Sequence, residues 1–453
     1  MRPIKINGKQ NKLFDMTPPR LILLSFLSII ILGTILLSTP LASQTGERTP
    51  ILIALFTATS ATCVTGLVAV DTGTHWSLFG QIVILFLIQF GALGLITLAT
   101  SFTVFLGKKI SLQGKRLAVE STNHFSYQGI LSLVRKVILI TLIAQFIGTI
   151  LLSFRFVPKF GLRGIYLSLF HTVSAFCNAG FDIMGNFTSL TRFNQDPYVL
   201  FVISLLIITG GLGFIVWDNL IDYKKTKILY LHTKIVLILS LILIFIGGLL
   251  FFILEHSNPL TIGELSTSNQ ITSSMFQSVT TRTAGFNSIE ISDMTDASKM
   301  LTIILMFIGA GPGSTAGGIK ITTFAIILIA IFSEIRGLHK TVIFNQKITR
   351  TIVFKALAII GLAGFLITIV TASLLLIENN YPFIDLLFEA TSAFGTVGLS
   401  SISTPNLTNL SRLIITFMMF IGRIGPLTFA ISIALRKKKH ADKIYPEGKV
   451  MVG

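Results

Sequence analysis

Four short segments of the chain combine glycine with small or hydroxyl-bearing residues in a pattern suited to binding a dehydrated cation. Carbonyl oxygens can replace the hydration shell of such an ion, and glycine permits the backbone angles that point successive carbonyls in one direction. Only one residue of the four segments is charged, so backbone carbonyls are better candidate ligands than carboxylates. The pattern predicts a binding site for a monovalent cation. The segments are Thr62-Cys63-Val64-Thr65-Gly66, Cys177-Asn178-Ala179-Gly180, Arg282-Thr283-Ala284-Gly285 and Gly395-Thr396-Val397-Gly398.

The four segments, which we call the filter turns, recur as parts of a longer repeat. Their last glycines are 105 to 114 residues apart, too long a period for a solenoid and typical of fused tandem units. A phenylalanine precedes the last glycine by ten residues in three turns and by nine in the third. A second glycine-containing motif follows each turn after 24 to 30 residues.

The composition identifies the solvent of these elements as a lipid bilayer. Hydrophobic residues make up 52% of the 453 residues, charged residues 12%, and the mean hydropathy is +0.81. A soluble domain carries about twice that charge fraction. Eight apolar runs are near or above the length that crosses a bilayer as a helix. These predicted spans cover roughly 21–39, 78–106, 134–156, 197–217, 235–254, 299–332, 353–377 and 411–435.

Each filter turn lies between two spans and follows a short apolar stretch, a length typical of a re-entrant helix. Non-helical backbone at membrane depth is tolerated only where protein buries it or where it lines a watery cavity. One such turn alone would be an inert connection between helices, but four in register indicate a shared pore. Re-entrant helices aim their partially negative C-termini at its centre, which favours a cation.

Basic residues predict the orientation. Most of the 36 Lys and Arg lie near the termini and in the loops between repeats, and a positive bias marks the cytoplasmic side. Both termini are therefore expected in the cytoplasm, with the filter turns opening outward, where most of the 19 Asp and Glu lie. The net charge of +17 follows from this topology, so we expect no nucleic-acid partner. The basic loops either dock other subunits or bind anionic lipid.

The sixth span is interrupted by a glycine-rich segment, which we call the inner loop. Five glycines and a proline cannot form a continuous helix, so this segment must line the pore cavity. We expect it to lie beneath the filter turns and to gate the pore. Its predicted gate residues are Gly309, Gly311, Gly313, Ser314, Thr315, Gly317 and Gly318.

Three basic residues fall within membrane-embedded segments. Arg423 is near the middle of the last predicted span, where a charge is costly. We expect it to contact carbonyls of the inner loop and to act with the gate. Lys320 either reaches a headgroup or faces the interior. Arg282 is expected behind the third filter turn, paired with Glu389.

The chain resembles the Trk/Ktr/HKT superfamily of potassium transporters over nearly its whole length. The residues that carry the resemblance are the four filter turns, the inner loop, Gly318-Ile319-Lys320 and Gly422-Arg423-Ile424-Gly425-Pro426. The closest resemblance is to KtrB-type membrane subunits of bacterial Ktr uptake systems. It implies an all-α integral membrane fold with four fused helix–pore-loop–helix repeats and eight transmembrane helices around a pseudo-fourfold pore. It further implies potassium as the substrate at the filter and sodium as a stimulator. Cys63 departs from the hydroxyl residue expected at its position.

The resemblance also implies the partners: a second copy of the chain in a homodimer, and a cytoplasmic ring of nucleotide-binding regulatory subunits of the KtrA/KtrC type. The nucleotide is expected on that ring, so this chain itself binds no cofactor, and lipid surrounds it in the bacterial cytoplasmic membrane. The predicted parts are the N-terminus 1–20, repeats 21–107, 134–220, 235–332 and 353–436, and the C-terminal tail 437–453.

The two alternative functions are a secondary transporter driven by carboxylates and an enzyme. A secondary transporter driven by carboxylates needs acidic residues at membrane depth, and no predicted span carries one centrally. An enzyme needs a metal cluster or a nucleophile with a base, and the spacing of His, Cys, Asp and Glu offers neither. We therefore expect a pore-forming transport subunit and no enzymatic activity.

Overall fold

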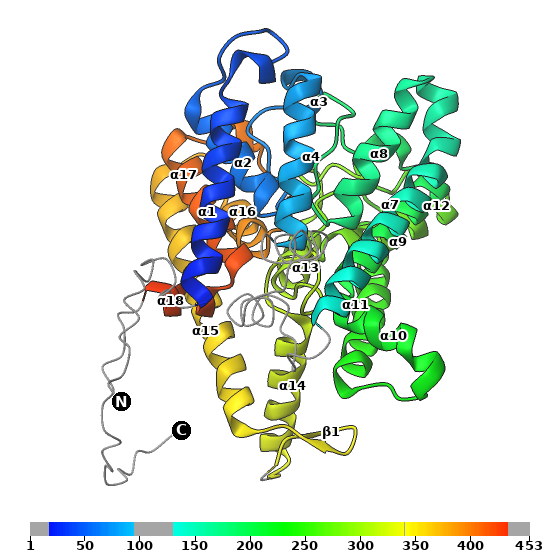
Figure 1. The fold of residues 1–453 in the computed structure, drawn as a ribbon, viewed down its shortest axis with the longest axis vertical. Helices are drawn as coiled ribbons and strands as arrows, with labels where there is room; N and C mark the ends of the chain where they lie inside the picture. The colour runs from blue at the N-terminus through cyan, green and yellow to red at the C-terminus, as the bar shows by residue number, and fades with distance from the viewer. Residues whose placement is uncertain (1–17, 95–129, 339, 434–453) are drawn as a thin grey trace, which may run out of the picture.

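The computed structural model describes residues 18–94, 130–338 and 340–433, and these are almost entirely helical (Figure 1). A long helix, a short re-entrant helix and a third helix follow one another four times, which confirms the predicted all-α architecture. The first helices are α1 (Pro18–Leu37), α7 (Ile130–Phe160), α11 (Leu231–Glu255) and α15 (Arg350–Ile377). The short helices are α2 (Ile51–Thr62), α8 (Arg163–Phe176), α12 (Thr267–Thr280) and α16 (Phe383–Gly395). The third helices are α4 (Leu78–Leu93), α9 (Pro197–Gly211), α13 (Asp296–Phe307) and α17 (Asn409–Ile424).

The length and composition of the first helices suit a membrane. All four are long and apolar enough to cross it, and two bent helix pairs raise the number to six. Large apolar side chains such as Phe245 and Phe365 are each 62% exposed on their surfaces, as expected of helix faces in contact with lipid.

Each of these third helices begins with a side-chain cap at its N-terminus. The side chains of Ser77, Asp196, Thr295 and Thr408 accept a hydrogen bond from a backbone N–H in the first turn of α4, α9, α13 and α17, respectively. Such caps satisfy donors that the helix leaves unpaired, and each stabilises a helix by about 1 kcal/mol. The polar residues after the filter turns therefore fix where the chain re-enters the membrane.

Two predicted spans are not straight. The predicted span 197–217 breaks after α9, and α10 (Phe214–Thr226) leaves at 92°. The span 411–435 breaks after α17, and α18 (Pro426–Ile433) leaves at 97°. The cause is Gly213 and Gly425, whose φ angles of 97° and 92° lie outside a right-handed helix. The sequence predicted a span at each of these positions but neither bend.

The four repeats pack in a closed circle. One cluster of buried apolar side chains joins the first and second repeats and reaches α12 of the third. A second cluster joins the first and fourth repeats, and a third joins the third and fourth. Figure 1 shows the consequence: the beginning of the chain, in blue, lies against its end, in orange. This arrangement brings the turns after the four short helices to one place.

The third repeat differs from the others. The inner loop separates α13 from α14 (Ile321–Ile335), which runs beside the start of α15 away from the rest of the molecule (Figure 1). A hairpin of β1 (Val342–Ile343) and β2 (Gln346–Lys347) joins α14 to α15, with Phe344 and Asn345 at positive φ. The sequence analysis expected only a loop there. The predicted N-terminal part to residue 17, the segment 95–107 and the tail 437–453 lie outside the described residues.

Candidate functional site: a ring of four backbone turns

The four filter turns share an unusual backbone. In each turn the last glycine has a positive φ, and so does the residue two positions before it. Positive φ is rare for residues with a branched Cβ and persists only where the surroundings hold it. Four turns of different sequence thus adopt one strained geometry, which points to a functional constraint. The φ angles of the preceding residues are 57° at Val64, 57° at Asn178, 74° at Thr283 and 49° at Thr396.

The four last glycines meet in a ring. A Cβ atom built on any of them would fall within 3.0 Å of a backbone carbonyl oxygen from the neighbouring turn. The order closes on itself, so each turn touches the next and the fourth touches the first. No side chain fits at these positions without moving backbone. The distances from the built Cβ are 2.6 Å from Gly66 to Ala179, 2.9 Å from Gly180 to Ala284, 2.4 Å from Gly285 to Val397 and 2.2 Å from Gly398 to Thr65.

Hydrogen bonds behind the ring leave its carbonyls free. The residue before each last glycine donates its N–H back to a carbonyl at the end of its own short helix, so the N–H groups are used behind the turn. The carbonyl oxygens of the same residues are those that face the neighbouring glycine. They can therefore serve as ligands. These bonds are Thr65 to Ser60 at 2.8 Å, Ala179 to Ser174 at 2.8 Å, Ala284 to Thr280 at 2.9 Å and Val397 to Ser392 at 2.9 Å.

One face of the ring opens into a cavity of about 220 Å³. We call it the outer cavity; the four last glycines and the carboxyl side chains of Asp71, Asp182 and Glu290 line it. Burial raises the pKa of Asp182 to about 7, and the nearby Asp71 carboxylate adds to this shift. Within the described residues, no three His, Cys, Asp or Glu side chains come close enough to hold a metal ion.

The inner loop lies on the other side of the ring and packs against the bases of two filter turns. Thr315 donates its hydroxyl to the carbonyl of Phe176 at 3.1 Å, the end of helix α8. A Cβ built on Gly317 would lie 1.9 Å from the hydroxyl oxygen of Thr396, in the fourth turn. The ends of the loop are held together by a bridge between Ile308 and Ile319.

The loop is also bonded to the glycine bend of the second repeat. Gly311 donates its N–H to the carbonyl of Gly211 at 2.9 Å, and Phe214 donates to the carbonyl of Gly313 at 2.9 Å. Its far face borders a second cavity of about 330 Å³. We call this the inner cavity; Gly313, Ser314, Ala316, Lys320 and Arg423 are among its lining residues. The loop therefore separates the ring from the inner cavity.

Two basic side chains grip the loop. Arg423 donates to the carbonyl of Thr315 at 2.6 Å and, with its other amino group, to Gly91 at 2.6 Å and Ala92 at 3.3 Å. The predicted contact between Arg423 and the loop is present, although Arg423 lies in the last turn of α17 rather than mid-span. Lys320 donates to the carbonyls of Ala316 and Gly317. It faces the interior, which decides between the two alternatives left open by the sequence.

The predicted pair of Arg282 and Glu389 is wrong. Arg282 does lie behind the third filter turn, but it donates to the carbonyl and hydroxyl of Ser240 on α11. Glu389 instead contacts Ser400, beyond the fourth filter turn. The two side chains belong to neighbouring repeats, and each finds a partner within its own.

Cys63 and Cys177 are free and fully buried at the ends of helices α2 and α8. The thiol of Cys177 lies against Gln89 and Gln145. Neither thiol lines the outer or the inner cavity, so within the described residues both behave as small packing residues.

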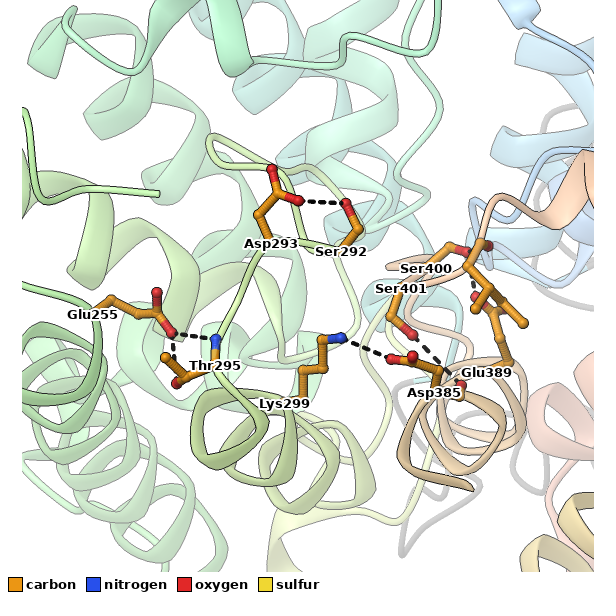
Figure 2. A network of polar contacts seen from close by, with 10 residues as sticks. Glu255, Ser292, Asp293, Thr295, Lys299, Asp385, Glu389, Ser400 and Ser401 are labelled. Carbon is orange, nitrogen blue, oxygen red and sulfur yellow. Dashed lines mark hydrogen bonds and ion pairs between the residues drawn. The ribbon is translucent and has the colours of Figure 1, made fainter. Parts of the chain in front are cut away.

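A polar network between the third and fourth repeats, drawn in Figure 2, was not predicted from the sequence. Lys299 of α13 and Asp385 of α16 form an ion pair at 2.9 Å, and each is only 7% exposed. Nearby, Glu255 accepts two hydrogen bonds from Thr295. The one signal in the sequence was a lysine at the edge of a predicted span and an aspartate in a re-entrant helix. Nothing in their spacing of 86 residues pairs them.

The sequence of the chain is similar to those of known transport proteins. The family model described as TrkH, cation transport protein, matches residues 25–443. The chain belongs to this family. The Ktr system potassium uptake protein B of Bacillus subtilis is 44% identical over 438 residues, 96% of this chain and 97% of that protein. The protein of the same name from Vibrio alginolyticus is 41% identical over 96% of this chain and 95% of its own length.

Two further relatives extend this family placement. The potassium/sodium uptake protein NtpJ of Enterococcus hirae is 38% identical over 97% of this chain and 98% of that protein. The crystal structure of the potassium transporter TrkH from Vibrio parahaemolyticus aligns with a TM-score of 0.70. It covers 90% of this chain and 84% of the other at 16% identity, a likeness that concerns the fold. The family consists of membrane transporters, which agrees with the non-enzymatic function expected from the sequence.

Proposed function

We propose that this chain is the pore-forming membrane subunit of a potassium-uptake system of the Ktr type. The observation that carries the proposal is the closed ring of four filter glycines, each against a carbonyl of the next turn. Carbonyls in such a ring can replace the water around a potassium ion. The relatives named above, which take up potassium by name, match over nearly the full length of both chains.

Helix dipoles and the acidic outer cavity support a cation as the substrate. All four short helices end at the ring, and the partial negative charge of a helix C-terminus stabilises a cation beside it by about 0.3–1 kcal/mol. Asp71, Asp182 and Glu290 add negative charge to the approach. The filter residues proposed for the ion are those of the four turns listed above.

The inner loop is proposed as the gate. It lies between the ring and the inner cavity, is made largely of glycine, and is tied by hydrogen bonds to the second and fourth repeats. Arg423 contributes to the gate in two ways. Its bonds to Thr315 and Gly91 hold the loop, and its charge adds an electrostatic barrier to a cation in the inner cavity.

The assembly follows from the same relationship. Ktr systems by name contain more than one component, and we propose that this chain forms a homodimer that binds a cytoplasmic nucleotide-binding ring. Stimulation of uptake by sodium is part of the proposal. Both termini are placed in the cytoplasm, with the outer cavity facing outward. The α14–α15 projection and its hairpin lie on the inner-loop side and offer a contact surface to such a ring.

Carboxylate-coupled transport needs an acid at membrane depth beside the path of the ion. The two acids of the fourth short helix, Asp385 and Glu389, line neither the outer nor the inner cavity. Asp385 is paired with Lys299, and Glu389 with Ser400.

The proposal is tested by uptake of rubidium into liposomes that contain the purified chain. Liposomes loaded with potassium chloride drive entry of external tracer rubidium through a selective pore. We expect uptake that external potassium inhibits more strongly than external sodium, and a further increase when a low concentration of sodium is present with the regulatory ring. Uptake no faster than in empty liposomes, with and without the ring, would contradict the proposal.

A further inference from the structure

The position directly behind each filter turn carries a buried polar side chain. It follows the phenylalanine that begins each repeated segment and lies nine residues before the last glycine in three turns and eight in the third. The four side chains are at most 2% exposed, yet their chemistry differs. They are Thr57, His171, Gln277 and Glu389.

Only one of these four residues is bonded to the segment that follows its filter turn. The hydroxyl of Thr57 and both amide atoms of Gln277 have no hydrogen-bond partner among the described residues. His171 bonds the carbonyl of Leu167 within its own helix. Glu389 instead contacts the hydroxyl of Ser400, two residues beyond Gly398. Within the described residues, this position therefore supports the segment after its turn in the fourth repeat alone; in the third repeat Thr280, at another position of α12, donates to the carbonyl of Phe286 at 2.6 Å.

The hydroxyl of Ser400 has three oxygen neighbours but only one proton to donate. Its hydroxyl oxygen lies within hydrogen-bond distance of Glu389 Oε1, the carbonyl of Ile402 and the hydroxyl of Thr404. Thr404 can donate its own proton to Ser400. An ionised Glu389 and the Ile402 carbonyl are both acceptors, so they would compete for the single proton of Ser400. A protonated Glu389 removes this competition, because its carboxyl can donate to Ser400 while Ser400 donates to Ile402.

The surroundings of Glu389 fit a neutral acid. The side chain is 0% exposed, and no Lys or Arg within the described residues forms an ion pair with it. Asp385, one turn earlier on α16, is already neutralised by Lys299. An ionised carboxylate in this place would be buried without a counter-charge, which is costly. The backbone N–H groups of Ser401 and Ile402 lie near the carboxyl and favour its charged form, whereas its Oε2 atom has no hydrogen-bond partner within the described residues.

We propose that Glu389, as a neutral carboxylic acid, is a positioning residue for the fourth filter turn. It donates to Ser400, and Ser400 donates to Ile402, so that the segment leaving Gly398 has one fixed path. The N–H of Gly398 is held from the same helix by the hydroxyl of Ser392 at 3.2 Å. Together these bonds fix the carbonyls of Thr396 and Val397 relative to the ring. This inference rests on the proposed function, since positioning matters only if the ring selects an ion.

Four variants in liposomes test the proposal by the selectivity of uptake for potassium over sodium. E389Q keeps a donor to Ser400 and an acceptor for the backbone N–H groups, whereas E389M fills a similar volume with neither. S400A removes the hydroxyl from the other side. T57V is the matched control, because it alters the equivalent position of the first repeat, where the hydroxyl has no partner. The thermal unfolding midpoint is measured for each variant.

We expect selectivity within about twofold of wild type for E389Q and T57V, and a loss of about fivefold for E389M and S400A, the size of one lost buried hydrogen bond. Unfolding midpoints are expected to stay near that of wild type in E389Q and S400A, so the selectivity change does not reflect unfolding. If E389M fails to fold, the contrast between E389Q and S400A decides.

Three results would overturn the proposal. Equal selectivity in wild type and S400A would mean that the contact does not position the turn. A loss in E389Q as large as in S400A would mean that the residue acts as a charged carboxylate. A loss in T57V as large as in S400A would mean that any change behind a turn has the same effect. Absence of rubidium uptake by the wild-type chain would instead contradict the proposed function, so the two failures are distinguishable.

Discussion

The four repeats are alike at the glycine ring and differ from one another beneath it. At the ring, four turns of different sequence have the same pattern of positive φ and the same contacts to their neighbours. On the other side, the second and fourth repeats bend at a glycine, whereas the third repeat contributes a loop that closes the space beneath the ring.

This difference teaches how a single chain can divide two tasks. Ion selection by carbonyls needs ligands on all sides, so every repeat must keep the same backbone. Gating needs one movable element, so a single repeat can diverge. The contacts of Arg423 from the fourth repeat and Gly211 from the second show that the neighbouring repeats have adapted to that loop.

The largest effect is expected from a break in the ring itself. In G398A the new Cβ would lie 2.2 Å from the carbonyl of Thr65, at a φ of 94° that a side chain disfavours. We expect rubidium uptake in liposomes to fall about 100-fold, equivalent to about 2.7 kcal/mol in barrier height. G364A is the matched control, since a Cβ at Gly364 meets no atom within 4 Å. Normal uptake by G398A would show that the ring is not the selective element.

Deletion of residues 311–317 tests the other side of the comparison. The deletion removes the segment between the ring and the inner cavity, including the carbonyl that Arg423 binds. We expect rubidium flux to rise about tenfold, the effect of removing a barrier of about 1.4 kcal/mol. Selectivity for potassium should persist because the ring is unchanged. Unchanged flux in a folded deletion variant would exclude the loop as a gate.

A smaller effect is expected from R423Q. The shorter neutral side chain loses the bonds to Thr315 and Gly91 and removes a positive charge from the inner cavity. We expect flux to rise about threefold, with selectivity unchanged, in the same assay. R412Q serves as the control for loss of an arginine from the same helix, because Arg412 does not line the inner cavity and bonds Pro405, which lies at the outer cavity. Wild-type kinetics in R423Q would remove Arg423 from the gate.

The smallest effect concerns pH at the outer cavity. Because burial raises the pKa of Asp182 to about 7, its carboxyl is charged above that pH and neutral below it. The cavity should therefore attract cations less at pH 6 than at pH 8. We expect the apparent KM for rubidium to be about twofold higher at pH 6. D182N should show the higher KM at both values, and a pH dependence that survives in D182N would assign it to another group.

The sequence predicted the elements that repeat. Four short helices, their glycine turns and the interruption of the sixth span are all visible as periodic or compositional signals. The glycine motifs at 210–213 and 422–425 were visible too. A glycine in the sequence does not show, however, whether the helix continues through it or bends there, because only its φ angle distinguishes the two. The bend at Gly213 lies against Pro312 and Gly313 of the inner loop, a tertiary contact that composition does not reveal.

Pairs of distant charges were harder to predict. The sequence suggested a partner for Arg282 by sign alone and chose Glu389, whereas the structure gives Arg282 the carbonyl of Ser240. The pair of Lys299 and Asp385 links helices of different repeats, and its formation depends on how α13 packs on α16. Such contacts are consequences of the circular packing rather than of any local pattern.

The central claim, that the ring of carbonyls binds a dehydrated cation, can be measured directly. Crystals of the protein grown with rubidium in place of potassium would show an anomalous scattering peak at any bound ion. We predict a peak on the axis of the ring, coordinated by the carbonyls of Thr65, Ala179, Ala284 and Val397, and a weaker one when sodium is in excess. A protein that takes up rubidium in liposomes but has no peak within the ring would contradict the account.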